Sequence, residues 1–290
     1  MSDLFLAEVM RTSRLTPGMV RVTFGGAGLS EFTTTGVGDE FVRVRFPGPD
    51  GELHLPTLDE AGNWREPAHD SHIEPYTIRK HDREAGEVTI DFVVHGHGKA
   101  GAWAANALPG ERVSFHAPRG LYEPPANATT QLFVTDATGI PALARLAEQL
   151  PASVHAVAAV EVAEESHRID LGSDRLQVKW IVGRGNGVGP SAMTEALRAM
   201  PISNDCYVWV AGEAGELREA RRYLRHERGL NAKQYAVIGY WRDKQEEWLE
   251  HYEALGDDTL AALAAIWDAA GDDDELKRDR YDLKLQELGL

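Results

Sequence analysis

The first part of the chain alternates hydrophobic and polar residues in short runs. Six such runs, separated by Gly, Pro and Asp, cover residues 4–16, 19–26, 39–49, 75–82, 86–96 and 111–120. A period of two is typical of strands that bury one face. Between the fifth and sixth runs the pattern becomes helical, through Trp103, Ala104, Ala105 and Leu108. Six strands with one embedded helix predict a small antiparallel six-stranded barrel.

Residues 123–130 form a linker by composition, and after it the period changes. Hydrophobic runs at residues 131–139, 154–162, 176–185, 207–212 and 233–241 alternate with helical patterns at residues 140–150, 191–200 and 213–229. Strands that alternate with helices predict a parallel sheet with helices on both faces. Ligands of such sheets bind beyond the carboxyl ends of the strands. The residues at those ends are Asp136, Ala137, Thr138, Gly183, Arg184, Gly212 and Glu213.

The last segment carries three helical patterns, in which apolar residues fall on one face at Leu260, Leu263, Ala264 and Trp267. The length of 290 residues exceeds one typical domain. We therefore expect an antiparallel β-barrel domain over residues 1–124, a parallel-sheet α/β domain over residues 125–242 and a helical extension over residues 243–290.

Charge and cysteine content narrow the function. The chain has 46 acidic and 30 basic residues, a net charge of −16, which disfavours nucleic acid and anionic membrane surfaces as partners. Cys206 is the only cysteine, so the chain alone holds no disulfide, zinc ribbon or iron–sulfur cluster. No basic N-terminal region precedes a long apolar run, and no apolar stretch approaches about 18 residues. We expect a cytoplasmic monomer.

Two neighbouring stretches carry the candidate chemistry. On the fourth predicted strand, Tyr76, Thr77 and Arg79 offer a ring for stacking, a short hydrogen-bond donor and a fixed cation. The fifth strand ends at the turn HGHGKAG, which leads into the predicted helix. Such a turn directs backbone N–H groups and the positive end of the helix dipole to one point, where Lys99 adds charge. These residues suit a flat, phosphate-bearing cofactor with its pyrophosphate at the helix N-terminus.

An ordered set of motifs extends to about residue 242: YTIR at 76–79, DFVVHG at 91–96, WA at 103–104, PGERV at 109–113, PRG at 118–120, DAT at 136–138, AGEAG at 211–215 and GYWR at 239–242. Through these motifs the chain resembles the siderophore-interacting proteins, flavin-dependent ferric-siderophore reductases on the ferredoxin-reductase plan. The resemblance implies FAD as cofactor, NAD(P)H or a ferredoxin as electron donor, and a ferric siderophore as substrate.

The resemblance also implies roles for particular residues. Tyr76 is implied to pack on the isoalloxazine ring, Thr77 to bond near its N5 and Arg79 to meet phosphate. The other implied flavin-binding residues are His95, Gly96, Lys99, Ala100, Gly101, Trp103, Asp136, Thr138, Tyr240 and Trp241. The implied substrate cluster is Arg43, Arg119 and Arg242, and we expect the nicotinamide dinucleotide near Gly183, Arg184, Gly212 and Glu213.

One departure from the family leaves the function open. The family usually carries an arginine two residues before the tyrosine, whereas this chain has Glu74. A carboxylate there repels a pyrophosphate, so either Arg79 and the helix N-terminus suffice or flavin binding is weakened. The expected function is an FAD-dependent NAD(P)H:ferric-siderophore oxidoreductase, in which electrons pass through the flavin and no catalytic side chain is needed. The alternatives are a related flavin reductase with another acceptor, or a protein that carries siderophore without reducing it.

Two further features have alternative interpretations. His95 and His97 lie two residues apart and could bind a metal, but spacing places no third ligand, so we expect no protein-bound metal. The predicted helix at residues 213–229 has one strongly basic face, formed by Arg218, Arg221, Arg222 and Arg225. We expect this face to be solvated; the alternative is a docking patch for the 2′-phosphate of NADPH or for an acidic ferredoxin.

Overall fold

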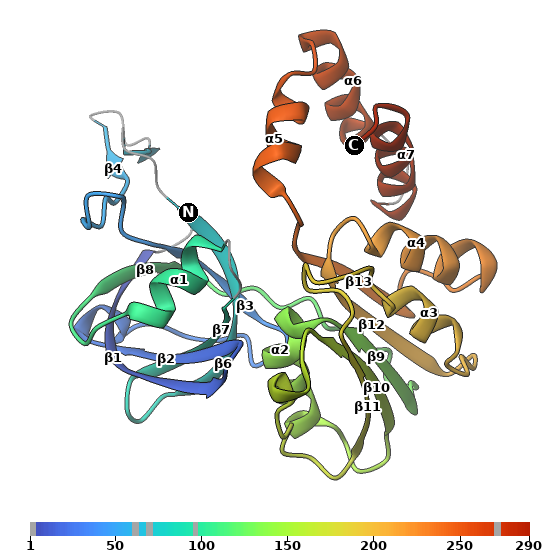
Figure 1. The fold of residues 1–290 in the computed structure, drawn as a ribbon, viewed down its shortest axis with the longest axis horizontal. Coiled ribbons are helices and arrows are strands. Elements are labelled where there is room, and N and C mark those ends of the chain that lie inside the picture. The colour runs from blue at the N-terminus through green and yellow to red at the C-terminus, as the bar shows by residue number, and fades with distance from the viewer. Residues whose placement is uncertain (1–3, 60–63, 68–71, 95–97, 270–273) are drawn as a thin grey trace.

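The computed structural model describes residues 4–59, 64–67, 72–94, 98–269 and 274–290. Six antiparallel strands close into the barrel that the sequence predicts (Figure 1). In order around the barrel they are β1 (Leu4–Thr16), β2 (Met19–Gly25), β7 (Glu87–Val93), β6 (Ile73–Asp82), β3 (Phe41–Arg45) and β8 (Arg112–His116). The loop between β3 and β6 holds a short antiparallel pair, β4 (Thr57–Leu58) and β5 (Trp64–Arg65). The sequence did not predict this pair, because strands of two residues give no periodic signal.

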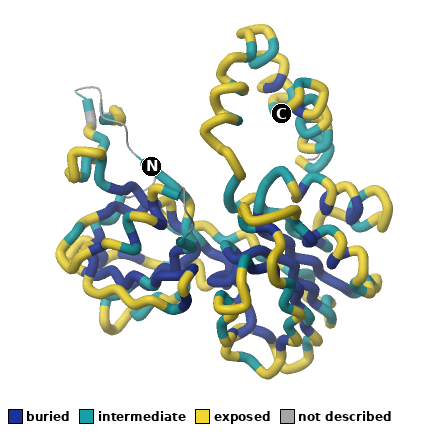
Figure 2. The backbone as a smooth tube through the Cα atoms, viewed as in Figure 1, coloured by how far each residue is buried: buried dark blue, intermediate teal, exposed yellow. Residues whose placement is uncertain are grey.

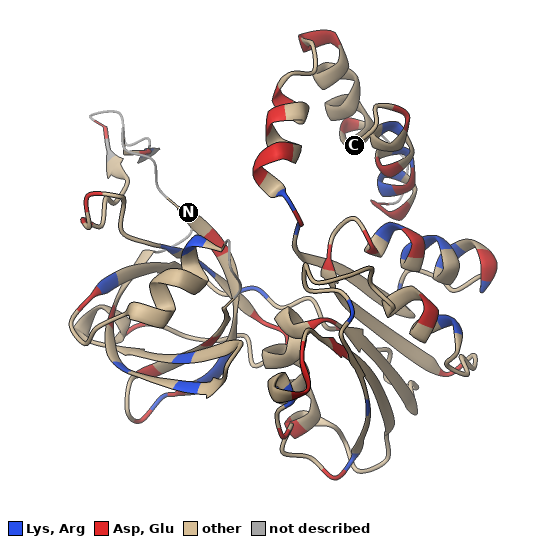
Figure 3. Cartoon of the chain, viewed as in Figure 1, with Lys and Arg blue, Asp and Glu red and all other residues tan. Residues whose placement is uncertain are grey.

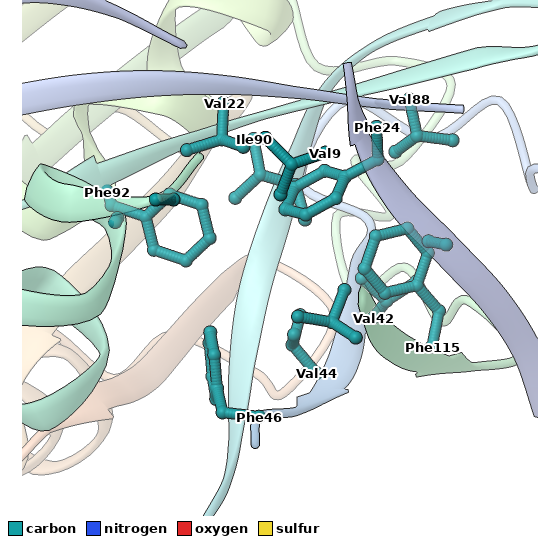
Figure 4. Close-up of a cluster of buried hydrophobic side chains, with 14 of the residues drawn as sticks. Val9, Val22, Phe24, Val42, Val44, Phe46, Val88, Ile90, Phe92 and Phe115 are labelled. Carbon is teal, nitrogen blue, oxygen red and sulfur yellow. The ribbon is translucent and has the colours of Figure 1, made fainter. Parts of the chain in front are cut away.

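Hydrophobic side chains from all six strands fill the barrel, and Figure 4 shows part of this cluster. Helix α1 (Lys99–Asn106) packs against this core, and its Trp103 indole stacks on Phe24 with ring centroids 6.3 Å apart. The helix ends before Leu108, which the sequence analysis placed in it and which is 64% exposed. Leu108 precedes Pro109, and a residue before proline avoids the helical conformation.

Five parallel strands form the second sheet, in the order β11 (Leu176–Val182), β10 (His155–Val162), β9 (Thr130–Thr135), β12 (Cys206–Glu213) and β13 (Tyr235–Trp241). Alternate residues of β9 enter different cores. Phe133 packs with α2 (Ile140–Gln149), whereas Leu132 and Val134 pack with α3 (Met193–Arg198) and α4 (Leu217–Arg222). Helices therefore cover both faces of the sheet, as predicted (Figure 1).

Helix α4 is shorter than the sequence predicts. It begins at Leu217 instead of Glu213, and a π-helical turn, Tyr223–Glu227, follows it. The Glu213 carboxylate accepts a hydrogen bond from the Glu216 N–H at 2.8 Å, so the residues before α4 form a turn. Short 3₁₀ helices occur elsewhere, at Ala27–Leu29, Ala137–Gly139 and Glu165–His167.

Helix α2 joins the sheet to the barrel. The Arg145 guanidinium donates to Glu40 Oε1 at 2.6 Å and to the carbonyl oxygen of Ile78 at 2.8 Å, and both charged side chains are buried. A second link runs from Trp209 Nε1 to Asp39 Oδ2 at 3.2 Å. These bonds hold the β3 and β6 side of the barrel against the sheet.

The C-terminal segment forms α5 (Gln245–Glu253), α6 (Asp257–Asp268) and α7 (Asp274–Glu287). Much of α5 and α6 is exposed (Figure 2), and acidic residues are frequent on α5 (Figure 3). None of the helices among the described residues is long and apolar enough to cross a membrane.

Helix α7 and the residues after it cover most of the basic face formed by α4 and the π-helical turn that follows it. Arg221 lies 3.1 Å from Asp282, and Arg225 lies 2.9 Å from Asp279. Arg218 donates to the Leu290 carbonyl oxygen at 2.6 Å. The prediction of a solvated face was therefore wrong for these three arginines, because a sequence pattern shows a charged face but not the oppositely charged segment that folds onto it.

Candidate functional site

Strand β6 places Tyr76 on the inner side of the barrel wall. Tyr76 pairs with Val42 of β3, which faces the core, and its ring centroid lies 4.5 Å from that of Phe92. Its hydroxyl donates to Glu74 Oε2 at 2.8 Å. Burial, reinforced by the Glu74 carboxylate, raises the pKa of the Tyr76 phenol, so the phenol remains a hydrogen-bond donor at neutral pH.

The next residue, Thr77, is buried on the side that faces the sheet. Its side chain lies beside Tyr240 at the end of β13; burial raises the pKa of that tyrosine, and the nearby Thr77 opposes the shift. The Tyr240 ring meets Trp209 edge to face, with centroids 6.2 Å apart. The structure thus brings together two of the predicted cofactor residues, one from each sheet.

The N-terminus of α1 is where the sequence predicts a phosphate. Its N-cap is Gly98, and among the described residues no side chain caps the first N–H groups of the helix. Lys99 is largely exposed and lies 3.3 Å from Glu246 of α5. Gly101 allows the helix to approach β7, because a Cβ there would lie 2.6 Å from the Val93 carbonyl oxygen.

Two other predicted residues of α1 face inwards, and two before it cannot be placed. Ala100 is buried against the barrel. The Trp103 Nε1 group is buried and has no hydrogen-bond acceptor within the described chain. His95 and Gly96 lie outside the described residues.

Two charged side chains of β6 are engaged by protein groups. Arg79, expected to meet phosphate, makes a bidentate pair with Glu148 of α2 at 2.5 and 3.1 Å. Glu74 contacts His72 Nε2 at 3.1 Å in addition to the Tyr76 hydroxyl. In this structure Arg79 therefore links the barrel to α2, and the Glu74 carboxylate lies between a tyrosine and a histidine.

Asp136 organises the carboxyl-end rim of the parallel sheet. Its Oδ1 accepts from the Thr138 N–H at 2.8 Å and the Thr138 hydroxyl at 2.5 Å. Its Oδ2 accepts from the Glu213 N–H at 3.0 Å and from Trp241 Nε1 at 2.6 Å. Burial raises the pKa of Asp136, and these hydrogen bonds oppose that shift. Four predicted residues thus meet in one network, in which Asp136 holds the rim in shape.

A second group at the rim includes residues that the sequence analysis missed. Asn186, in the left-handed conformation at φ 54°, accepts from the Ala137 N–H at 3.0 Å and donates to the Glu161 carbonyl oxygen at 3.2 Å. It therefore closes the turn that contains Gly183 and the exposed Arg184 over the sheet edge. The available signal was an Asn between glycines, since Asn tolerates this conformation.

Close packing at Gly212 fixes the β12 end of the same rim. A Cβ at Gly212 would lie 2.7 Å from Asp136 Oδ2.

The sequence analysis also missed Glu161 of β10. Its side chain is buried and accepts hydrogen bonds from the Ser191 hydroxyl at 2.9 Å and the Ala192 N–H at 2.8 Å. Burial raises the pKa of Glu161.

The three arginines implied for substrate lie in two places. Arg43 and Arg119 are exposed on neighbouring segments of the barrel, because Arg119 bridges to Phe41, two residues before Arg43 on β3. Arg242 instead lies over the Trp248 ring of α5, with its Cζ 4.4 Å from the ring centroid. The part of the chain that the structure describes contains no group of three His, Cys, Asp or Glu side chains arranged for a metal ion.

Comparison with known proteins decides the family. Residues 8–122 match the family described as "Siderophore-interacting FAD-binding domain", and residues 128–244 match "Siderophore-interacting protein". The chain belongs to the siderophore-interacting protein family. This confirms the resemblance, and the fold is ferredoxin-reductase-like, as predicted.

Three relatives illustrate the match. An uncharacterised protein of Mycobacterium tuberculosis is 34% identical over 83% of this chain and 90% of its own length. The "NADPH-dependent ferric-chelate reductase" of Escherichia coli is 30% identical over 84% of this chain and 95% of its own length. A crystal structure of a "siderophore utilization protein from T. fusca" is 34% identical, with a TM-score of 0.74, over 84% of this chain and 94% of that one.

Proposed function

We propose that this protein is an FAD-dependent reductase of ferric siderophores, which releases iron as Fe(II) with electrons from NAD(P)H or a ferredoxin. Family membership supports the proposal, as does similarity to a protein named as an NADPH-dependent ferric-chelate reductase. The observation that carries it is the match of residues 8–122, which form the barrel, to the family's FAD-binding domain.

Electron transfer through a flavin requires no side chain to act as a general acid, a general base or a nucleophile. Bound FAD supplies the conversion of a two-electron hydride into single electrons. Hard oxygen donors hold ferric iron far more tightly than ferrous iron, so one-electron reduction releases the metal. The protein has to bind, orient and shield the reactants.

The residues present fit FAD. The N-terminus of α1, which no described side chain caps, and Lys99 suit its pyrophosphate, and the buried Trp103 Nε1 is a donor without an acceptor among the described residues. Tyr76 presents an aromatic ring, and Thr77 a buried hydroxyl. Glu74 opposes the pyrophosphate in charge, but its carboxylate already accepts a hydrogen bond from Tyr76.

We assign the electron donor to the rim of the parallel sheet, lined by Gly183, Arg184, Gly212 and Glu213. The ferric chelate is assigned to the barrel side, where Arg43 and Arg119 are exposed on one face. Arg242 contributes if α5 releases it from Trp248. We also propose that the protein is a monomer in the cytoplasm.

An anaerobic experiment tests the proposal. The protein is loaded with FAD and mixed with NADH, NADPH or a reduced ferredoxin, and a ferric siderophore is then added together with a ferrous-iron indicator. We expect the flavin colour to bleach, and then to return as Fe(II) appears. Bound flavin that no donor bleaches would overturn the proposed donor. A colourless protein that takes up no FAD but binds ferric siderophore would instead support a siderophore carrier. Glu74 would favour that function, because its carboxylate repels the pyrophosphate of FAD.

A further inference from the structure

A buried arginine at the end of β3 has guanidinium N–H groups for which the described residues provide no acceptor. Arg45 has 0% of its surface exposed. Its Nη2 donates to Glu66 Oε2 at 2.6 Å, but its Nε and Nη1 are buried and have no acceptor among the described residues. Removal of a guanidinium from water is unfavourable unless its charge and its N–H groups are satisfied. A group of this kind calls for an acceptor that the described chain does not provide.

Two more polar groups without partners lie beside Arg45. Ser114 of β8 stands directly opposite it in the register of β3 and β8 and is 1% exposed, with its hydroxyl unpaired. Residues opposite each other in an antiparallel pair have Cβ atoms about 5 Å apart. His116, two residues further on β8, shares this face and has a buried Nε2 without a partner. Three side chains on one patch of the barrel wall thus have donors or acceptors without partners in the part of the chain that the structure describes.

The charge around this patch favours an anion. Arg43 lies two residues before Arg45, so it projects from the same face of β3. Burial, followed by the charges of Arg45 and Arg43, lowers the pKa of His116. His116 is therefore neutral at physiological pH and can donate a hydrogen bond through Nε2 without adding charge. Two guanidinium groups, a hydroxyl and a neutral imidazole make a suitable set of donors for an oxygen anion.

The group that Arg45 holds in this structure is itself a carboxylate. Glu66 follows β5 in the loop between β3 and β6, and its side chain is 69% exposed. A solvent-exposed side chain thus reaches the buried arginine from outside. Its carboxylate marks both the position and the chemical class of a ligand group, and it satisfies only one of the three guanidinium nitrogens.

We propose that Arg45, Ser114 and His116 form a subsite for a free carboxylate of the ferric chelate, which Glu66 closes in the ligand-free protein. The inference rests on the proposed function and narrows its substrate class to ferric chelates that carry carboxylates. The chelate carboxylate replaces Glu66 on Arg45 and takes further hydrogen bonds from Ser114 and His116, while Arg43 faces the rest of the anion. A neutral chelate has no group for this subsite, so its binding does not depend on Arg45.

Two substitutions with matched controls test the subsite. Arg45→Met removes the charge but keeps an unbranched side chain of similar size, a change that buried sites often tolerate. Glu66→Gln weakens the competing carboxylate at an exposed position. The controls are Arg112→Met and Glu52→Gln, which change exposed residues on β8 and in the same loop as Glu66.

Binding of ferric dicitrate and of ferrichrome, a neutral hydroxamate chelate, is measured by tryptophan fluorescence on the full, FAD-loaded chain. Reduction of both chelates is measured in parallel. We expect R45M to weaken ferric dicitrate binding about tenfold or more, as for the loss of charged hydrogen bonds, with ferrichrome unchanged. E66Q should tighten ferric dicitrate binding several-fold, and neither control should differ from the wild type.

The outcomes separate the subsite from the function. If the wild type reduces both chelates and R45M binds ferric dicitrate as well as the wild type does, the subsite is wrong and the proposed function stands. If the FAD-loaded wild type neither binds nor reduces either chelate, the function fails and the subsite with it. Should R45M not fold, E66Q decides alone, because unchanged affinity for ferric dicitrate would show that Glu66 does not compete.

Discussion

Substitution of Arg145 by methionine should lower the free energy of unfolding, because it breaks the buried ion pair between the barrel and the parallel sheet domain. Arg145 is 8% exposed and Glu40 is 0% exposed, and the two lie 2.6 Å apart. Arg145→Met keeps the hydrophobic part of the side chain but removes the charge and the hydrogen bond to the Ile78 carbonyl oxygen. Glu40 would then hold a buried negative charge, with the Thr35 N–H and hydroxyl as its described side-chain contacts, both at 2.5 Å.

The expected loss of folding stability depends on the charged group that stays buried, which is Glu40. The net contribution of one hydrogen bond is about 1 kcal/mol, but removal of one partner of a buried ion pair costs about 3–5 kcal/mol because the other charge stays buried. Folded proteins are stable by only about 5–15 kcal/mol, so R145M should lose a large part of the free energy of unfolding. The double variant Arg145→Met with Glu40→Gln removes the uncompensated charge and should recover most of the loss.

Urea unfolding, followed by both tryptophan fluorescence and circular dichroism, measures these changes. Arg168→Met is the control, because Arg168 forms an exposed ion pair with Glu165 and such pairs contribute about 1 kcal/mol or less. A loss below about 1 kcal/mol for R145M, or a double variant no more stable than R145M, would refute the view that this pair holds the two sheets together.

Three further outcomes are expected. Gly101→Ala should raise the dissociation constant for FAD about tenfold, because the new Cβ would lie 2.6 Å from the Val93 carbonyl oxygen and displace α1; Gly256→Ala, with open space around its Cβ, should bind FAD normally. Burial raises the pKa of Asp136, so the folded chain keeps this proton to a higher pH than the unfolded chain does. The free energy of unfolding of the wild type, relative to that of D136N, should therefore be greatest below about pH 4, the ordinary pKa of Asp. It should fall as the pH rises through the pKa of the folded state. Urea unfolding midpoints of the two proteins that differ by the same amount at every pH would contradict this. Burial raises the pKa of Cys206 to about 11, so a thiol reagent should label it slowly in the folded protein at about pH 8 and fully after unfolding.

Sequence pattern predicted most of the fold because its signals are local. The alternation along β1, β2 and β7 and the helical period of α2 depend on residues that are neighbours in the chain. Errors occurred where the deciding group was also local but was not considered, as at the end of α1 before Pro109. The motif order indicated the family, which the comparisons confirmed.

Partners distant in sequence were decided only in three dimensions. The sequence shows that Arg79, Arg221 and Arg45 are cations, but not that Glu148, Asp282 and Glu66 neutralise them. These contacts join residues from 21 to 69 positions apart, and several carboxylates in an acidic chain compete for each arginine. The strength of an ion pair depends on distance and burial, and packing alone sets both. The sequence by itself therefore determined the elements, the order of the motifs and the family, whereas the tertiary structure determined which carboxylate neutralises each of these arginines.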